Sequence, residues 1–380
     1  MESLLPRKIC YITGTRADFG LMKSTLHLLN NDPNLELGIV VTGMHLDPAC
    51  GMTVNEIEEA QLPIEARIKL EKMTTSGEAM ALHIGTMLRG FTAHLSTNRP
   101  DIVLLLGDRG EMLAGALAAI HLNIPVAHIH GGERSGTVDE SVRHAISKLS
   151  HIHFAATEQS KQRLIKMGEQ ETSIFVSGAP GLDELDEIEL PSLQQLAEKY
   201  NLDAQRSIAI LLFHPVLQEA DEAKAQTEII LKALQTSNHQ ILALMPNSDS
   251  GGQYVRQALQ DYTEKCSLRL ATHLPRLEFL SFLKNGDLLI GNSSAGIIES
   301  ACFGIPVINV GSRQNLRERN ANVTDLPIDQ QRLEQALQDL KGMRFPCQNI
   351  YGNGTAGQAI LSKLKSVDLT PNLLNKVIAY

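Results

Sequence analysis

Two polar loops carry the residue types that general acid/base catalysis uses. The first follows the apolar run 101–106 and contains Asp108, and the second follows the next apolar run and contains His130, Glu133 and Asp139. Carboxylates can remove or deliver a proton, and imidazole titrates near neutral pH. Aspartate is also a common helix N-cap, so a catalytic and a purely structural interpretation both stay open for Asp108.

A second group of residues suits an anionic ligand such as a diphosphate. Arg16 lies in a glycine-containing turn after residues 9–13, where we expect backbone N–H groups to face an anion. Ser293 and Ser294 stand at the start of an expected helix, and Arg313 follows the next strand. A simple turn and a simple helix cap are the alternatives, but several charge-assisted contacts together could hold a nucleotide diphosphate.

Two further residues belong to this binding group. His214 closes an apolar run, which predicts that its side chain points into a cleft, and Glu299 lies on the helix that begins at the two serines. The chain has neither the G-x-G-x-x-G pattern nor a P-loop. Both absences argue against a dinucleotide dehydrogenase and a nucleoside triphosphatase.

Two H-x-H pairs raise the question of a metal site. His128 and His130 are expected to share a strand face, as are His151 and His153. A protein metal site needs further ligands, and no carboxylate or thiolate stands at a defined spacing from these pairs. We therefore predict no metal and no cofactor, and we expect His128, His151 and His153 to be structural.

Composition excludes several classes of protein. The chain has 34 basic and 43 acidic residues, a net charge of −9, and only 4% aromatic residues, so nucleic acid is not an expected partner. No apolar run approaches the ~18 residues that span a membrane. The N-terminal sequence lacks the pattern of a signal peptide, and five widely spaced cysteines without a C-x-x-C motif indicate reduced thiols. We therefore expect a cytoplasmic protein.

The elements that must position these residues alternate between short apolar runs and longer helical stretches. The expected strands are 9–13, 35–42, 101–106, 124–129, 152–156 and 173–176, then 207–213, 240–245, 267–271, 287–290 and 306–310. The expected helices are 17–30, 78–97, 111–122, 140–149 and 158–167, then 219–235, 253–265, 276–284 and 295–303.

The pattern restarts near the middle of the chain, which predicts two α/β domains. The strands are almost entirely apolar, as in parallel sheets that are buried on both faces. We expect an N-terminal Rossmann-like domain over 1–182 and a C-terminal, nucleotide-binding one over 183–359, with a seam within 180–205. Ligands of such sheets bind beyond the carboxyl ends of the strands, so the cleft between the two sheets is the expected site.

A series of long motifs in fixed order resembles a known family. These motifs are GTRADFG, VTGMH, LGDRGE, HIHGGERSGTVDES, RHAISKLSHIHF, FHP and GNSSAGIIES with FGIPVINVGSRQ. Together they look like the hydrolysing UDP-N-acetylglucosamine 2-epimerases of sialic acid biosynthesis, from about residue 8 to about residue 325.

The resemblance implies the two-Rossmann glycosyltransferase-B architecture, with residues 360–380 returning to the first domain, and a homodimer or homotetramer. It also implies a reaction. UDP-GlcNAc loses the C2 proton and UDP, giving 2-acetamidoglucal, and water then adds with inverted configuration at C2. The products are N-acetylmannosamine and UDP, and no metal or nicotinamide takes part.

The resemblance also implies roles for single residues. The catalytic positions of the family fall on Asp108 and Asp139. Related epimerases carry a third acid, a glutamate, where this chain has His130, so either His130 or Glu133 supplies that proton transfer. The nucleotide contacts of the family fall on Arg16, His214, Ser293, Ser294, Glu299 and Arg313.

Four other functions remain open from the sequence. The same chemistry could act on UDP-2,4-diacetamido-2,4,6-trideoxyglucose, for legionaminic acid synthesis. A non-hydrolysing epimerase would return an intact UDP-sugar, and the HIHGGE loop argues against it. A glycosyltransferase of the same architecture would depend on an acceptor. A catalytically inactive nucleotide-sugar binder would gain nothing from three carboxylates in two loops.

Overall fold

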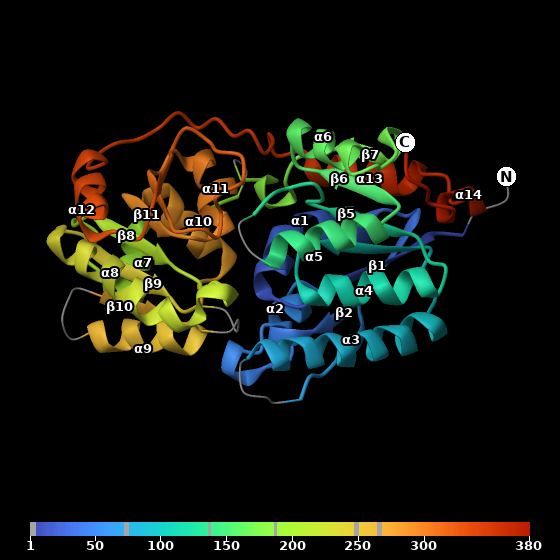
Figure 1. The fold of residues 1–380 in the computed structure, drawn as a ribbon, viewed down its shortest axis with the longest axis horizontal. Helices are drawn as coiled ribbons and strands as arrows, with labels where there is room; N and C mark the ends of the chain where they lie inside the picture. Colours follow the sequence, from blue (N-terminus) through green and yellow to red (C-terminus); the bar gives the residue numbers. More distant parts are fainter. Residues whose placement is uncertain (1–4, 72–75, 136–137, 186–187, 247–250, 264–267) are drawn as a thin grey trace.

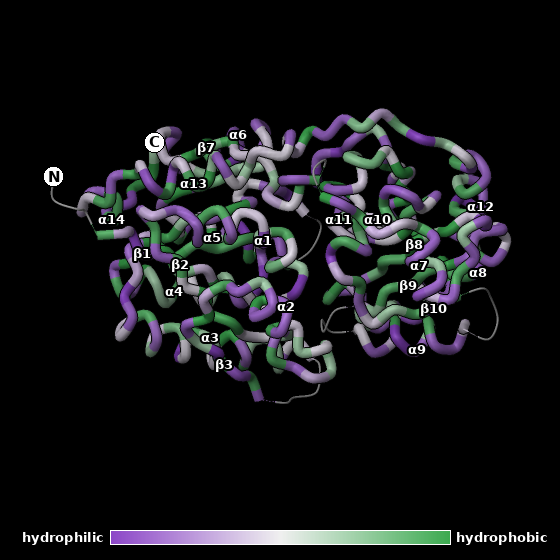
Figure 2. Tube along the Cα trace, turned by 180° about the vertical axis from the view of Figure 1, so that it is seen from behind, coloured by the Kyte–Doolittle hydropathy of each residue, from purple (hydrophilic) through white to green (hydrophobic). Residues whose placement is uncertain are grey.

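The structure is a computed structural model that describes residues 5–71, 76–135, 138–185, 188–246, 251–263 and 268–380. It forms two α/β lobes that lie side by side (Figure 1). Each lobe is built on one parallel sheet, and Figure 2 shows the apolar strands of both sheets enclosed by helices with hydrophilic outer faces. No helix among the described residues combines the length and the hydropathy needed to cross a membrane.

The N-terminal sheet has seven parallel strands in the order β3-β2-β1-β4-β5-β6-β7. The reversal of strand order beside β1 is the switch point at which Rossmann-like sheets bind ligands. Its strands are β1 (Arg7–Thr13), β2 (Leu35–Thr42), β3 (Ile64–Ile68), β4 (Ile102–Leu106), β5 (Val126–Ile129), β6 (Ile152–Ala155) and β7 (Ile174–Val176). Its helices are α1 (Arg16–Asn31), α2 (Val54–Glu59), α3 (Gly77–Thr97), α4 (Gly110–His121), α5 (Val138–Leu149) and α6 (Glu158–Lys166).

The C-terminal sheet repeats this arrangement with six parallel strands in the order β10-β9-β8-β11-β12-β13. Its strands are β8 (Ile208–Leu212), β9 (Gln240–Leu244), β10 (Leu268–Ala271), β11 (Leu288–Gly291), β12 (Val307–Val310) and β13 (Val323–Leu326). Its helices are α7 (Leu193–Tyr200), α8 (Ala223–Thr236), α9 (Gly252–Tyr262), α10 (Arg276–Asn285), α11 (Ser294–Ile298) and α12 (Gln330–Asp339).

Both faces of each sheet are covered by apolar helix faces. In the N-terminal lobe one core cluster joins β1 to Leu26 of α1, and a second joins the opposite sheet face to Phe91 of α3. In the C-terminal lobe Ile230 of α8 and Leu280 of α10 belong to the two corresponding clusters. This double coverage explains why nearly every central strand residue is apolar.

The end of the chain crosses back to the N-terminal lobe. After α12 the chain runs over both lobes to α13 (Ala356–Ser366) and the short α14 (Pro371–Leu374) (Figure 1). Ile360 and Leu364 of α13 enter the core cluster that contains α1. The carboxylate of Asp183 accepts a hydrogen bond of 2.9 Å from the backbone N–H of Ala356, which holds the start of α13.

The sequence analysis missed β3 and β13, two of the four edge strands, because each contains charged residues and is not a continuous apolar run. β3 has the sequence IEARI and β13 has VTDL, and each covers only one edge of its sheet. The helix expected over 219–235 is also divided into a 3₁₀ segment, Leu217–Glu222, and α8. Gly136 and Thr137 of the GTVDES motif, with Cys266 and Ser267, lie outside the described residues.

Candidate active site

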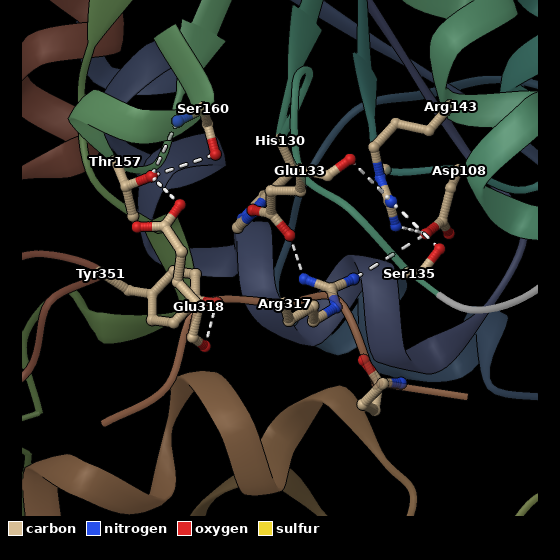
Figure 3. A network of polar contacts seen from close by, with 12 residues as sticks. Asp108, His130, Glu133, Ser135, Arg143, Thr157, Ser160, Arg317, Glu318 and Tyr351 are labelled. Carbon is tan, nitrogen blue, oxygen red and sulfur yellow. Dashed lines mark hydrogen bonds and ion pairs between the residues drawn. The ribbon is translucent and has the colours of Figure 1, made fainter. Parts of the chain in front are cut away.

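Asp108, His130 and Glu133 come together because they follow the carboxyl ends of two neighbouring central strands, β4 and β5. The loops after β4 and β5 face the loop after β12 across the boundary between the lobes (Figure 3). Parallel strands place all their carboxyl ends at one edge, and two such edges that face each other form one polar site. The site is therefore a property of both lobes.

Asp108 binds an arginine and does not cap a helix. The N-cap of α4 is Arg109, which makes no side-chain capping bond. The Asp108 carboxylate instead accepts from Nη2 of Arg143, on α5. Arg143 is 1% exposed and also donates to the Ser135 Oγ at 3.3 Å. The structural interpretation of Asp108 as a cap is thus wrong, and the residue belongs to a polar network.

His130 and Glu133 form a buried pair. The Nδ1 of His130 contacts Oε1 of Glu133, and the two residues are 7% and 2% exposed. β5 ends at Ile129 and His130 has a φ of 66°, so His130 and His128 do not share a strand face as expected. The left-handed backbone turns His130 away from the strand direction and toward the loop of Glu133.

Arg317 completes this cluster from the other lobe, and sequence reasoning missed it. Its Nη1 donates to Oε2 of Glu133, and its Nη2 lies 3.9 Å from Oδ2 of Asp108. Arg317 lies four positions after Arg313 in the loop that follows β12. This proximity to a predicted ligand was the one feature of the sequence that could have identified Arg317. Arg143 was also missed as a functional residue, although its motif was noticed.

The charges in the cluster control the ionisation of Glu133. Burial by itself would raise the pKa of Glu133, but the charges of Arg317 and His130 outweigh burial and lower that pKa to about 2. Both carboxylate oxygens of Glu133 are also occupied, one by each partner. Glu133 is therefore an ionised carboxylate that holds His130, and its Nδ1 contact leaves the Nε2 of His130 for other partners.

Asp139 and Arg313 meet across the lobe boundary. Asp139 lies in the first turn of α5, and its Oδ2 is 3.7 Å from Nη2 of Arg313. Arg313 also donates from Nη1 to the backbone oxygen of Asn292 at 3.1 Å. One expected acid/base residue and one expected diphosphate ligand are thus neighbours.

His214, Ser293 and Ser294 lie at the ends of the central C-terminal strands. Asn292 ties β8 to β11 through two 2.8 Å hydrogen bonds, one from the His214 N–H and one to the His214 oxygen. Ser293 is the N-cap of α11 and accepts from the Ala295 N–H at 3.4 Å. Because α11 has only five residues, its contribution to binding an anion is smaller than a long helix would make.

Glu299 and Arg16 lie apart from the Asp108 cluster. Oε1 of Glu299 accepts from Arg276, which also donates to the Gly181 oxygen at 2.6 Å. Arg16 is half-buried, and its buried Nη1 has no hydrogen-bond partner among the described residues. Burial lowers the pKa of Arg16, although nearby Glu56 acts in the opposite direction.

The turn beside Arg16 differs from the expectation. The backbone N–H groups of Gly14 and Thr15 donate to the Asp18 carboxylate at 3.2 and 3.0 Å, so they are not available to an anionic ligand. Asp18 and Thr15 form the capping box of α1, which the sequence reading overlooked. Burial raises the pKa of Asp18 to about 6, although hydrogen bonds from Thr13 and Gly14 act in the opposite direction.

The other three histidines of the two H-x-H pairs have partners within the fold. His128 contacts the Gly107 oxygen at 2.7 Å, His153 contacts Glu169 at 2.9 Å, and His151 accepts from the Val126 N–H at 3.1 Å. In the part of the chain that the structure describes, no three His, Cys, Asp or Glu side chains are grouped as a metal site requires.

Two facing Rossmann-like lobes with carboxylates, arginines and His130 at their junction define an α/β protein of the glycosyltransferase-B type. A family model described as UDP-N-acetylglucosamine 2-epimerase matches residues 27–365. The chain belongs to this family and is a UDP-sugar 2-epimerase, which confirms at the level of the family the resemblance that the motifs indicated.

Two relatives and one solved structure illustrate the similarity. A UDP-N,N'-diacetylbacillosamine 2-epimerase (hydrolyzing) of Legionella pneumophila is 49% identical over 375 residues, which cover 98% of this chain and 100% of the relative. A UDP-N-acetylglucosamine 2-epimerase of Neisseria meningitidis is 38% identical, covering 92% of this chain and 91% of the relative. A crystal structure of UDP-GlcNAc 2-epimerase from Neisseria meningitidis bound to UDP-GlcNAc has a TM-score of 0.81 at 19% identity. It covers 94% of this chain and 99% of its own, and the expected architecture is thereby confirmed.

Proposed function

We propose that this chain is a hydrolysing epimerase that acts on UDP-2,4-diacetamido-2,4,6-trideoxyglucose, the nucleotide sugar also called UDP-N,N'-diacetylbacillosamine. The cluster of Asp108, His130 and Glu133, held by two arginines, carries the assignment of the chemistry. The substrate rests on the Legionella relative, which is 49% identical over its entire length and bears this activity in its name.

The proposed reaction removes the C2 proton while the bond from C1 to the diphosphate oxygen breaks. UDP leaves, and an unsaturated sugar remains. Water then adds its oxygen to C1 and a proton to the opposite face of C2, so one sugar nucleotide and one water give UDP and the 2-epimeric free sugar. Two acid/base groups on different sides of the ring are needed, since C2 is inverted.

We assign one of these proton transfers to His130, because Glu133 has no free carboxylate oxygen. In this assignment Glu133 accepts from the Nδ1–H of His130 and thereby directs Nε2 toward the sugar. Asp108 is the second acid/base group, and its carboxylate is held by Arg143. Asp139, at the edge of the same network, is the third candidate.

The C-terminal lobe binds the nucleotide in this proposal. Arg313, Ser293 and Ser294 contact the diphosphate, and His214 lies beside them on the end of β8. Glu299 accepts from the ribose hydroxyls, and Arg16 reaches the nucleotide from the N-terminal lobe. The buried Nη1 of Arg16, which has no partner among the described residues, supports that contact.

UDP-GlcNAc is the second candidate substrate, favoured by the name of the Neisseria relative. Proton and phosphorus NMR in D₂O with each nucleotide sugar tests both proposals. Release of UDP with a free sugar deuterated at C2, faster from the diacetamido compound, supports the first proposal. Faster turnover of UDP-GlcNAc would make UDP-GlcNAc the preferred substrate in place of the diacetamido compound. Detection of an intact UDP-linked epimer would overturn the proposal that the enzyme is hydrolysing. Turnover only in the presence of an acceptor identifies a transferase.

A further inference from the structure

The loop after β12 reaches into the other lobe. We call residues 312–319 the bridging segment. Besides Arg317, which binds Glu133, it carries Glu318, whose carboxylate accepts from Thr157 Oγ1 at 2.6 Å and lies 3.2 Å from Nη2 of Arg163. Together with Arg313, which pairs with Asp139, these two adjacent side chains dock the bridging segment on the N-terminal lobe.

Arg317 is the member of the bridging segment that touches the acid/base cluster. Figure 3 shows its guanidinium lying between Glu133 and Asp108. The side chain is 8% exposed, so its charge is screened little by solvent. One guanidinium thus orients two carboxylates that belong to two different loops of the opposite lobe.

Glu133 depends on this contact for its charge. The charged and titratable groups around it are His130 on its own loop, Arg317 on the bridging segment, Arg163 on α6, Arg143 on α5, and His128 and Tyr351. Arg143 contacts only the backbone oxygen of Glu133, at 3.3 Å. Arg317 comes from the other lobe, so separation of the lobes would take its positive charge away from Glu133. A buried carboxylate needs such a charged partner to stay ionised.

We propose that Arg317 is an interdomain positioning residue, which makes the ionised Glu133–His130 pair and the placement of Asp108 conditional on contact between the two lobes. The inference rests on the proposed role of His130 as a proton carrier. When the lobes part, Glu133 takes up a proton more readily and no longer holds the Nδ1–H of His130. The site is then competent only when the cleft is closed around the nucleotide sugar.

Three variants test the inference, with Glu318→Gln as the matched control on the same segment. Arg317→Gln should lower kcat at least tenfold and move the acidic limb of its pH profile upward by about 1–3 units, the effect of losing an adjacent opposite charge. Arg317→Lys should restore part of the shift, because the charge remains. Glu318→Gln removes an interdomain contact and should leave the acidic limb of the pH profile in place. Equal losses of kcat in both Gln variants, with unmoved limbs, would show that Arg317 only docks the segment.

A measurement without turnover separates this inference from the proposed function. Carbon-13 NMR of glutamate-labelled protein, with Glu133→Gln to assign the signal, reports the titration of Glu133 directly. We expect Arg317→Gln to raise its midpoint by about 1–3 units, and Glu318→Gln to leave it unchanged. An unmoved midpoint overturns the inference even if both substrates react. If neither substrate reacts but the midpoint moves, the proposed function fails and the coupling stands.

Discussion

The two lobes share one strand order but provide different chemistry. Both sheets have the same strand order around their switch points. It is β3-β2-β1-β4 in the N-terminal lobe and β10-β9-β8-β11 in the C-terminal lobe, with further strands beyond β4 and β11. The N-terminal loops carry Asp108, His130 and Glu133, which are held by charged contacts. The C-terminal loops after β8 and β11 are joined by the neutral amide of Asn292. In the proposed function, acid/base groups thus belong to one lobe and diphosphate ligands to the other.

This difference shows that a repeated fold can divide a reaction. In the proposed function, the N-terminal carboxylates would repel a diphosphate if they stood alone, and the C-terminal residues bind the nucleotide without taking part in the proton transfers. Arginines from the C-terminal lobe, Arg313 and Arg317, contact acids of the N-terminal lobe and reduce that repulsion. This division can be tested by variants of both lobes, taken here from the largest expected effect to the smallest.

The largest expected effect comes from removing an acid/base group of the N-terminal lobe. Asp108→Asn should lower turnover by about 10²–10⁴-fold, because an amide cannot exchange the proton. UDP affinity, measured by calorimetry, should stay nearly the same. Asp339→Asn, at an exposed position of α12, is the control for the substitution itself. Normal turnover in Asp108→Asn would remove this residue from the mechanism.

The next effect should appear in binding and should come from the C-terminal lobe. Arg313→Ala should weaken UDP affinity by roughly 10- to 150-fold, the range that charge-assisted hydrogen bonds contribute. Calorimetric titration measures this, with Arg332→Ala on the exposed face of α12 as the matched control. If UDP binds Arg313→Ala as tightly as the unaltered protein, Arg313 serves only to pair with Asp139.

A third prediction concerns the backbone of the acid/base loop. Gly132 has a φ of 77°, and an added Cβ would lie 2.3 Å from the Ser160 oxygen. Gly132→Ala should therefore destabilise the protein by about 1–3 kcal/mol, the usual cost of a left-handed non-glycine residue, or more. Urea unfolding measures this change in the free energy of unfolding. Gly85→Ala is the control, because Gly85 lies within α3 with open space around it, and this change should not destabilise.

The smallest effect tests the charge of Glu133 through stability. Its folded-state pKa of about 2 lies below the ordinary 4.5, so the unfolded chain takes up a proton first as the pH falls. Its contribution is complete above about pH 4.5 and is lost toward pH 2. Between pH 6 and pH 3.5 the unaltered protein should lose about 1.4 kcal/mol through this group. Urea unfolding of Glu133→Gln should lack that part of the slope, and identical slopes would contradict the assigned ionisation.

Local patterns in the sequence determined the two α/β halves, most central strands and the candidate residues. Buried parallel strands must be apolar, and polar loops must follow them where ligands bind, so both signals lie within a few neighbouring residues. The edge strands β3 and β13 were missed because they are partly exposed and contain charged residues, and so lack the continuous apolar run of a buried strand.

Only the tertiary structure decided how the candidate residues are paired. His130 and Glu133 were alternatives in the sequence, and the fold makes them partners with distinct proposed roles. Arg317 is 184 positions from Glu133, and Arg143 is 35 positions from Asp108. The first pair depends on how the two sheets face each other and the second on how α5 packs beside the loop after β4, and no local pattern of residues encodes either distance. The residue types set the available chemistry, and the packing of the two lobes set which charge controls which proton.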